Sequence, residues 1–188
     1  MILRIRVSKG QSQRGFTLLE VMFAAAVLGI GLLGLLGLIT TAIASNNRNK
    51  LDSSATLISQ MVAEQIATVP GNASTNVTIT DCNPITSSAS HTVSTTGTSS
   101  GAGANRDGSG NIDFTQAYSG VTANYAMLYY ACAASTGDRA STYDVRWNVK
   151  TLTTNTKLVT VAARRNNTNT SLPIFFAIPV SLKLIVGL

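Results

Sequence analysis

Residues 14–45 read RGFTLLEVMFAAAVLGIGLLGLLGLITTAIAS, and this stretch decides how the chain is organised. Between Phe16 and Ser45 it holds one charged side chain, that of Glu20. The 24 residues from Val21 to Ala44 carry no charge. As a helix they would span ~36 Å at ~1.5 Å per residue, which is enough to cross a hydrocarbon core of ~30 Å. The stretch therefore predicts a transmembrane helix.

The basic residues before this stretch set its expected orientation. Charged residues make up 12% of the 188-residue chain, about half of the ~25% usual in soluble domains, and the formal net charge is +6. Four bases and no acid lie in the first 15 residues: Arg4, Arg6, Lys9 and Arg14. By the positive-inside rule we expect residues 1–14 in the cytoplasm and the C-terminal body outside it. Because most of the charge is local to the N-terminus, we predict no specific nucleic-acid partner for the body.

An ordinary secretory signal peptide is the alternative explanation of the stretch. Ala42-Ile43-Ala44 offers a small-x-small cleavage site, and the mature chain would then begin at Ser45 as a secreted periplasmic or adhesive binding protein. Two features disfavour this alternative. The apolar region is far longer than the roughly 7 to 15 residues usual in signal peptides, and the carboxylate of Glu20 stands near its beginning.

The segment Arg14-Gly15-Phe16-Thr17-Leu18-Leu19-Glu20-Val21 resembles the class III leader junction of type IV prepilins and pseudopilins. In that family a basic leader and the pattern G-F-T-L-x-E precede a long apolar helix. The resemblance covers about residues 9–45. It implies as partners other pilin subunits, a prepilin peptidase and an inner-membrane assembly platform, and it implies a path from the bacterial inner membrane and periplasm to the pilus filament.

The resemblance also assigns roles to three residues. Gly15 would be the last leader residue, because a small side chain lets the peptidase reach the bond to Phe16. Phe16 would become the mature N-terminus and would be N-methylated. Glu20 is disfavoured by about 2.5 to 3.5 kcal/mol inside a membrane unless it finds a partner, and we expect it to neutralise the Phe16 ammonium of a neighbouring subunit in assembly.

Beyond Ser45 the helical pattern continues but becomes amphipathic. One apolar stripe recurs at spacings of three and four residues and consists of Leu51, Ala55, Ile58, Val62, Ile66 and Val69. Pro70-Gly71 then predicts the end of the helix. The expected organisation is a leader (1–15), a transmembrane or filament-core helix (16–45), the amphipathic half of the helix (46–70) and an exported β-rich domain (71–188). The expected fold class is α+β and pilin-like, with the helix packed on an antiparallel sheet.

Alternating patterns predict the strands of the exported domain. Thr142–Thr151 places Tyr143, Val145, Trp147 and Val149 on a core face and Asp144, Arg146, Asn148 and Lys150 on a solvent face. Thr153–Thr156 predicts a turn and 157–164 a return strand. Residues 121–133 and 76–80 are further strand candidates. The tail 172–188 holds Pro173, Pro179 and Lys183, so we expect an edge strand or an irregular packed segment there.

The segments YDVRWNV (143–149) and KLVTVAAR (157–164) resemble, less specifically, the C-terminal strand pair of the minor pilins called PilV, or type IV pilus modification proteins. Trp147 is expected in the core. Residues 86–111 are rich in Ser, Thr, Gly and Ala, and predict a weakly ordered surface loop. Within this region Asp107–Asp113 spaces oxygen ligands as calcium loops do, but Ile112 stands where the calcium pattern needs Gly, so a turn is favoured.

Cys82 and Cys132 are the only cysteines. Because the body is expected outside the cytoplasm, we predict a disulfide between them, with two free buried thiols as the alternative. The single histidine, His91, makes a metal site improbable, and no catalytic constellation or cofactor site is found. The sequence thus predicts no enzyme but a minor pilin that supports pilus biogenesis. The alternatives are a pseudopilin of a type II secretion system and the secreted protein cleaved after Ala44.

Overall fold

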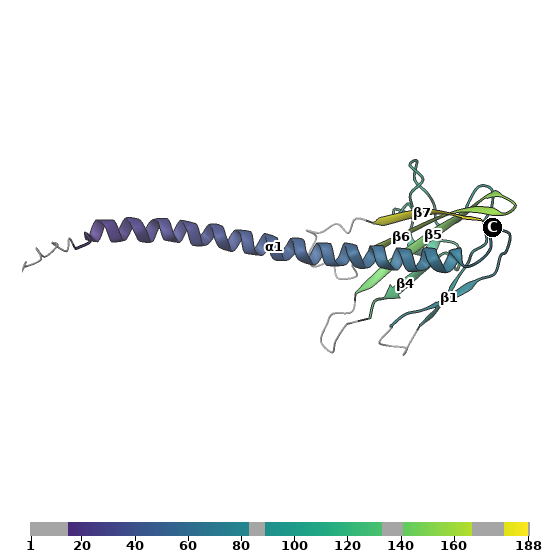
Figure 1. Ribbon diagram of the computed structural model, residues 1–188, viewed down its shortest axis with the longest axis horizontal. Helices are drawn as coiled ribbons and strands as arrows, with labels where there is room; N and C mark the ends of the chain where they lie inside the picture. The colour runs from purple at the N-terminus through teal and green to yellow at the C-terminus, as the bar shows by residue number, and fades with distance from the viewer. Residues whose placement is uncertain (1–14, 83–88, 133–140, 167–178, 188) are drawn as a thin grey trace, which may run out of the picture. The chain divides into compact units, whose positions relative to one another are not determined.

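The chain divides into two compact units, residues 1–47 and residues 48–188, and each is described by itself. The computed structural model describes residues 15–82, 89–132, 141–166 and 179–187 (Figure 1). One helix, α1 (Leu18–Ala67), contributes residues to both units. The helix expected over residues 16–70 is therefore present, and it begins two residues later and ends three residues earlier than predicted.

The strands form two antiparallel sheets in the second unit. The smaller sheet pairs β1 (Val77–Thr80) with β2 (Ser90–Val93). The larger sheet has the order β3-β5-β6-β7, and β4 also pairs with β5. Its strands are β3 (Ala102–Gly103), β4 (Ala126–Tyr130), β5 (Thr142–Thr153), β6 (Thr156–Arg165) and β7 (Val180–Gly187). A short 3-10 helix, η1 (Tyr118–Gly120), precedes β4.

The C-terminal half of α1 packs against these strands, and this packing confirms the predicted α+β fold class (Figure 1). Five of the six residues of the predicted apolar stripe are buried, namely Ala55, Ile58, Val62, Ile66 and Val69. The first four of these belong to one core cluster with the inward face of β5, whose residues Tyr143, Val145, Trp147 and Val149 are at most 1% exposed. The indole nitrogen of Trp147 donates a hydrogen bond to the Ser94 carbonyl oxygen at 3.0 Å. Trp147 is therefore the core residue that its strand position predicted.

The end of α1 is fixed by a close approach of two turns. Pro70-Gly71 follows the helix, as the sequence predicted. A side chain at Gly71 would clash with the carbonyl oxygen of Asn155, which lies in the turn between β5 and β6. Glycine is therefore required here by space, because any Cβ would push the two turns apart.

Three of the four β5 residues expected to face solvent are buried instead. Asp144, Arg146 and Asn148 are 4%, 1% and 5% exposed, and Lys150 is partly buried. The segment before β4 covers them: Arg146 donates to the Gln116 carbonyl oxygen at 2.6 Å, and Asn148 donates to the Ala104 carbonyl oxygen at 2.8 Å. The alternation of the strand was predicted correctly, but the half-buried assignment was wrong because a polar face can be covered by a segment that supplies hydrogen bonds.

The weakly ordered loop expected at 86–111 is also wrong for residues 89–111, which contain β2 and β3. Val93, Ser94, Thr95 and Ala104 are buried there. Backbone hydrogen bonds hold this region, since the Ser94 amide donates to the Asn124 carbonyl and the Ala104 amide to the Trp147 carbonyl. Order here comes from backbone pairing, which the Ser- and Thr-rich composition did not reveal. Residues 86–88 lie outside the described residues.

Three smaller predictions can be compared with the structure. The turn at Asp107–Asp113 is confirmed, because the Asp107 carboxylate accepts hydrogen bonds from the Ser109 and Asn111 amides at 2.9 Å. The strand expected at 121–133 is shorter, and the strand expected at 76–80 is present as β1. In the tail, β7 ends the strand order and is an edge strand, while residues 172–178 lie outside the described residues.

Candidate processing and assembly site

The bond predicted to be cleaved, between Gly15 and Phe16, lies in an exposed segment before α1. Gly15, Phe16 and Thr17 are not helical, and 82% of Phe16 is exposed. No atom of the described chain lies within 4 Å of the place where a Cβ would stand at Gly15. The fold does not require a glycine at this position. A requirement for a small residue there would have to come from another molecule.

Thr17 ends this segment and begins the helix. The Glu20 amide donates to the Thr17 hydroxyl oxygen at 3.3 Å, and the Glu20 and Val21 amides donate to the Thr17 carbonyl oxygen at 3.1 and 3.2 Å. Thr17 therefore acts as the N-cap, and Glu20 stands three residues later, which is the spacing of a capping box. The sequence F-T-L-L-E thus sets the point at which α1 starts.

Glu20 presents its carboxylate on the exposed first turn of the helix. Among the described residues its side chain has no hydrogen-bond or ion-pair partner. A negative charge in the first turn interacts favourably with the helix dipole. The position suits an acid that remains free to pair with a cation supplied from outside the chain.

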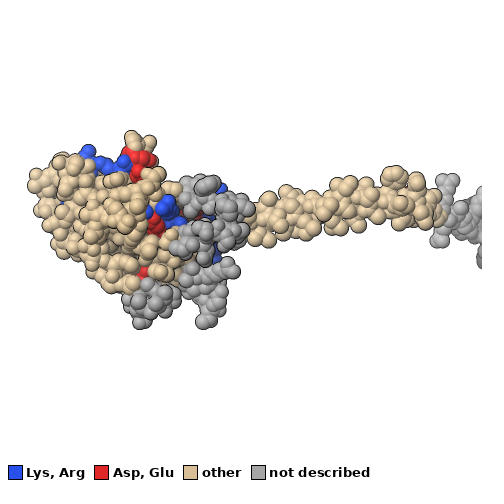
Figure 2. Space-filling model, turned by 180° about the vertical axis from the view of Figure 1, so that it is seen from behind, with Lys and Arg blue, Asp and Glu red and all other residues tan. Residues whose placement is uncertain are grey.

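The first unit presents an apolar surface. Its large hydrophobic side chains from Leu18 to Ile43 are between 52% and 79% exposed. By length and composition α1 is able to cross a membrane, and the apolar window is not buried against the described part of the chain. In the view of Figure 2 the visible surface of this part of the helix carries no Lys, Arg, Asp or Glu, whereas charged groups are visible on the strand-bearing unit. So much exposed apolar surface needs lipid or another protein to cover it.

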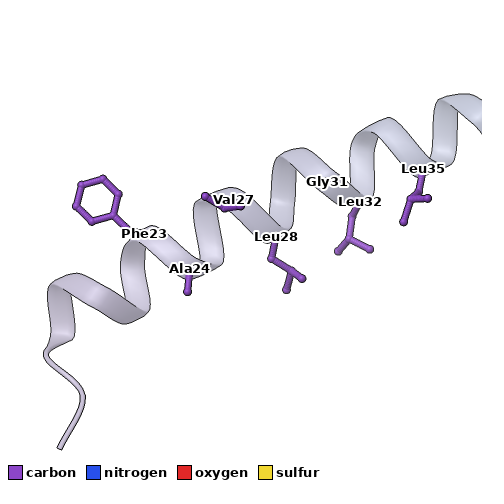
Figure 3. A pocket seen from close by; sticks show the side chains of 7 residues that line it. All are labelled: Phe23, Ala24, Val27, Leu28, Gly31, Leu32 and Leu35. Carbon is purple, nitrogen blue, oxygen red and sulfur yellow. The ribbon is translucent and has the colours of Figure 1, made fainter. Parts of the chain in front are cut away.

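One side of this helix carries a shallow apolar groove (Figure 3). Its lining consists of Phe23, Ala24, Val27, Leu28, Gly31, Leu32 and Leu35. Gly31 has open space where a side chain would stand, as do Gly29, Gly34 and Gly37. Glycines that the chain itself does not need allow a neighbouring helix to approach closely.

The two threonines near the end of the apolar segment satisfy their hydroxyl groups within the helix. Thr40 donates to the Gly37 carbonyl oxygen at 2.9 Å, and Thr41 donates to the Leu38 carbonyl oxygen at 2.9 Å. A hydroxyl that bonds to its own helix needs no water. These residues are therefore compatible with an apolar surrounding.

Cys82 and Cys132 form a disulfide in the second unit, with their Cα atoms 5.1 Å apart. Cys82 follows β1 and Cys132 follows β4, so the bridge joins the two sheets. Next to it, the Cys82 amide donates to the Tyr130 carbonyl at 3.2 Å, and the Tyr130 amide donates to the Asp81 carboxylate at 3.0 Å. The same carboxylate contacts the His91 ring at 3.0 Å. His91 is thus engaged with the β1–β2 sheet, and the described residues contain no group of metal ligands.

A buried ionic cluster on β5 and β6 was missed from the sequence. Arg146 donates two hydrogen bonds to the Asp144 carboxylate, at 2.9 and 2.8 Å, and Arg164 donates a third at 3.3 Å. Phe114 and Tyr118 border the cluster, and burial raises the pKa of the Tyr118 hydroxyl. The sequence did hold a signal for this cluster: Asp144 and Arg146 alternate on one face of β5, and the neighbouring strand β6 ends in Arg164-Arg165.

The comparison with protein families identifies the N-terminal region. Residues 10–36 match the model of the prokaryotic N-terminal methylation motif. This motif is typical of type IV pilins and pseudopilins, and together with the exposed apolar helix it supports a pilin-like protein that is anchored in a membrane and assembles with other subunits. No curated protein and no solved structure matches the chain.

Proposed function

We propose that the chain is a minor pilin of a type IV pilus, cleaved after Gly15, N-methylated at Phe16 and incorporated into the filament through the first half of α1. The observation that carries the proposal is an exposed apolar helix whose first turn presents the unpaired carboxylate of Glu20 within the matched motif. In this role the chain is a structural subunit and the substrate of a peptidase. The PilV-like resemblance of the β5–β6 hairpin supports the minor pilin assignment.

The physical basis of assembly is the pairing of two charges that are costly in an apolar setting. Cleavage would leave an ammonium group on Phe16, and Glu20 of a neighbouring subunit would neutralise it within the helix bundle. An unpaired charge buried in this way costs several kcal/mol. The pairing would therefore favour subunits that have been cleaved and whose Phe16 lies level with Glu20 of the neighbouring subunit along the filament axis.

A pseudopilin of a type II secretion system would use the same N-terminal chemistry, and the methylation motif covers both classes. Secretion genes beside the coding gene would favour the pseudopilin, and pilus-assembly genes the pilin. The secreted alternative requires cleavage after Ala44. The Ala44–Ser45 bond lies inside α1, where the helical backbone is poorly presented to a peptidase.

Glu20→Ala tests the assembly role. We expect this variant to insert in the membrane and to be cleaved, but to be missing from sheared filaments, because each subunit would bring an unpaired ammonium into the bundle. Immunoblots of sheared filaments and of membranes measure both steps. Glu64→Ala is the matched control, since Glu64 is an exposed acid on the same helix in the second unit. Glu20→Ala subunits in filaments at wild-type abundance would show that Glu20 is a bystander.

A further inference from the structure

An open pocket in the second unit lies beside the buried ionic cluster. Its volume is about 360 Å³. Strands β5 and β6 contribute Asp144, Arg146 and Arg164 to its lining, and the segment before η1 contributes Phe114 and Gln116. The pocket therefore brings two guanidinium groups and one carboxylate to an opening on the surface of the strand domain.

The charges around this pocket do not balance. Asp144 is held by Arg146 through two parallel hydrogen bonds, which is the strongest arrangement of such a pair. The remaining Arg146 contact goes to the Gln116 carbonyl oxygen. Arg164 makes one longer hydrogen bond, 3.3 Å, to the same Asp144 oxygen that Arg146 already holds. The two oxygens of one carboxylate thus serve two cations, and Arg164 carries the surplus charge.

The Arg164 side chain is held in place by its neighbours while most of its hydrogen-bonding capacity stays unsatisfied within the described chain. Its guanidinium lies over the Phe114 ring at 4.5 Å from the ring centre, and the Arg146 guanidinium lies over the same ring at 4.9 Å. The Arg164 side chain is 35% exposed, whereas that of Arg146 is 1% exposed. Among the described residues Asp144 is the only hydrogen-bond acceptor of Arg164. The other N–H donors of this guanidinium have no acceptor among the described residues, and Arg164 lines the pocket.

We propose that this pocket binds one carboxylate group from outside the chain, with Arg164 as the residue that receives it. The planar guanidinium fork matches a carboxylate through two parallel N–H···O bonds. The aromatic ring beneath it limits the rotation of the side chain and reduces the entropy lost on binding. All residues that line this pocket belong to the second unit, so acetate binding can be measured whether or not the chain assembles through Glu20 and the apolar part of α1.

The charges favour a carboxylate over a phosphate. The cluster offers one surplus positive charge, which one carboxylate neutralises. Asp144 lies in the pocket, and Asp113 lies close enough for Arg146 to contribute to the lowering of its carboxyl pKa, after its hydrogen bonds to Thr115. A phosphate dianion would bring a second negative charge toward these two acids. A small molecule and an Asp or Glu of a neighbouring protein subunit present the same carboxylate group, and the experiment below distinguishes these two sources.

The test measures acetate binding to the mature full-length chain in detergent micelles, followed by the nitrogen and hydrogen resonances of the arginine Nε–H groups. Chloride at the same ionic strength is the reference. We expect acetate to shift the Arg164 resonance saturably and chloride to leave it unchanged. Arg164→Gln should weaken acetate binding at least ~10-fold, because hydrogen bonds between charged groups contribute about 1.5 to 3 kcal/mol.

Arg165→Gln is the matched control. Arg165 is the next residue of β6, and its side chain lies on the opposite face of the strand. Its replacement by Gln removes the same charge as Arg164→Gln does. The Arg165→Gln substitution should change acetate affinity by less than ~2-fold, because the partly exposed Arg165 side chain does not line the pocket and its charge is screened by solvent. Arg164→Lys keeps the charge without the fork and should bind more weakly than the wild type, and the backbone amide spectrum of each variant reports whether it is folded.

Three results would overturn the proposal: equal shifts with acetate and chloride, equal loss of affinity in Arg164→Gln and Arg165→Gln, or tighter binding of phosphate than of acetate. The source of the carboxylate is assigned with sheared filaments of the two glutamine variants. Lower incorporation of Arg164→Gln alone supports an acid of a neighbouring subunit as the ligand. Equal incorporation of both variants supports a small carboxylate from solution.

Discussion

Lys157 joins three backbone segments of the second unit at a buried position. Its ammonium group donates to the carbonyl oxygens of Ala73, which follows α1, and of Thr95, which follows β2. The residue is 6% exposed, and it forms no ion pair with the described acids. Burial lowers the pKa of this lysine, since a charge is poorly solvated there. The buried ammonium group thus satisfies two carbonyl groups, and the desolvation of its charge opposes this stabilisation.

We expect the stability of the second unit to depend on the charge of Lys157. Between its lowered folded pKa and the unfolded value of 10.5, the unfolded state binds more protons, so stability rises with pH in that window. Lys157→Met should lower the free energy of unfolding near neutral pH by roughly 1 to 3 kcal/mol, because two carbonyls lose their donor. The difference from the wild type should grow as the pH rises toward 10.5.

Denaturant titrations followed by Trp147 fluorescence measure this effect, because Trp147 is the single tryptophan and lies in the core of the second unit. Lys150→Met is a control of equal charge change on the neighbouring strand, where the side chain is partly exposed. A difference between Lys157→Met and the wild type that is constant over the pH range would contradict the account.

The helix and the main strands could be predicted from the periodicity of the sequence, but the pairing register between the strands could not. Helix α1 follows from its unbroken apolar run and its stripe, and the β5–β6 hairpin follows from two alternating segments around a turn. A regular two-residue turn between Thr153 and Thr156 would place Asp144 opposite Arg165. A bulge between Thr151 and Thr153 shifts the register by one residue and places Asp144 opposite Arg164. The ionic cluster therefore depends on the one extra residue of this bulge, which no local sequence pattern predicts.

The covered face of β5 shows a second limit of prediction. Alternation says which residues share a face, but what lies over that face depends on distant segments. Gln116 and Ala104 reach Arg146 and Asn148 across 30 and 44 residues of sequence. Similarly, β2 and β3 are held by backbone partners that composition cannot identify. The processing junction, in contrast, can be recognised from adjacent residues alone, and residues 10–36 match the methylation motif. Cleavage after Gly15 stays a prediction.

The disulfide should contribute strongly to the stability of the sheets that it joins. Cys82→Ser combined with Cys132→Ser should lower the free energy of unfolding by roughly 4 kcal/mol on the loop-entropy model, since the bridge closes a long loop. Trp147 fluorescence during denaturation measures the loss, and the reduced wild type should behave as the double variant does. Uptake of an alkylating reagent by both cysteines in native, unreduced protein would contradict the bridge.

For the whole molecule, the two units place opposite demands on their surroundings. Exposed large hydrophobic side chains crowd the first unit, while beyond residue 47 the described chain exposes four: Leu57, Tyr118, Leu152 and Ile185. The second unit also has its own core, in which residues 55–66 of α1 pack on the sheet. The exposed apolar surface of the first unit needs lipid or neighbouring helices to cover it. The surface of the second unit is compatible with water, because isolated exposed apolar side chains are common on soluble domains.

We therefore expect a chain that begins at Arg48 to be folded and soluble without detergent, whereas the chain that begins at Phe16 should need detergent. Size-exclusion chromatography measures solubility, and Trp147 fluorescence measures folding. A matched variant, Val62→Asp in the shorter chain, should unfold it, because Val62 is fully buried in the core. Precipitation of the unsubstituted shorter chain in the absence of detergent would mean that the second unit depends on the first.

The most direct test of the central claim, that this chain is processed and assembled as a pilin-like subunit, is the mass of its N-terminal peptide after isolation from the membranes of its host. The account predicts a mature chain that begins at an N-methylated Phe16. Gly15→Val should leave the precursor uncut and Gly15→Ala should still be cleaved, because we expect the peptidase to accept only a small side chain before the bond. The described chain leaves open space around a Cβ at this position, so the fold itself does not exclude a side chain there. A mature chain that begins at Ser45, or normal cleavage of Gly15→Val, would contradict it.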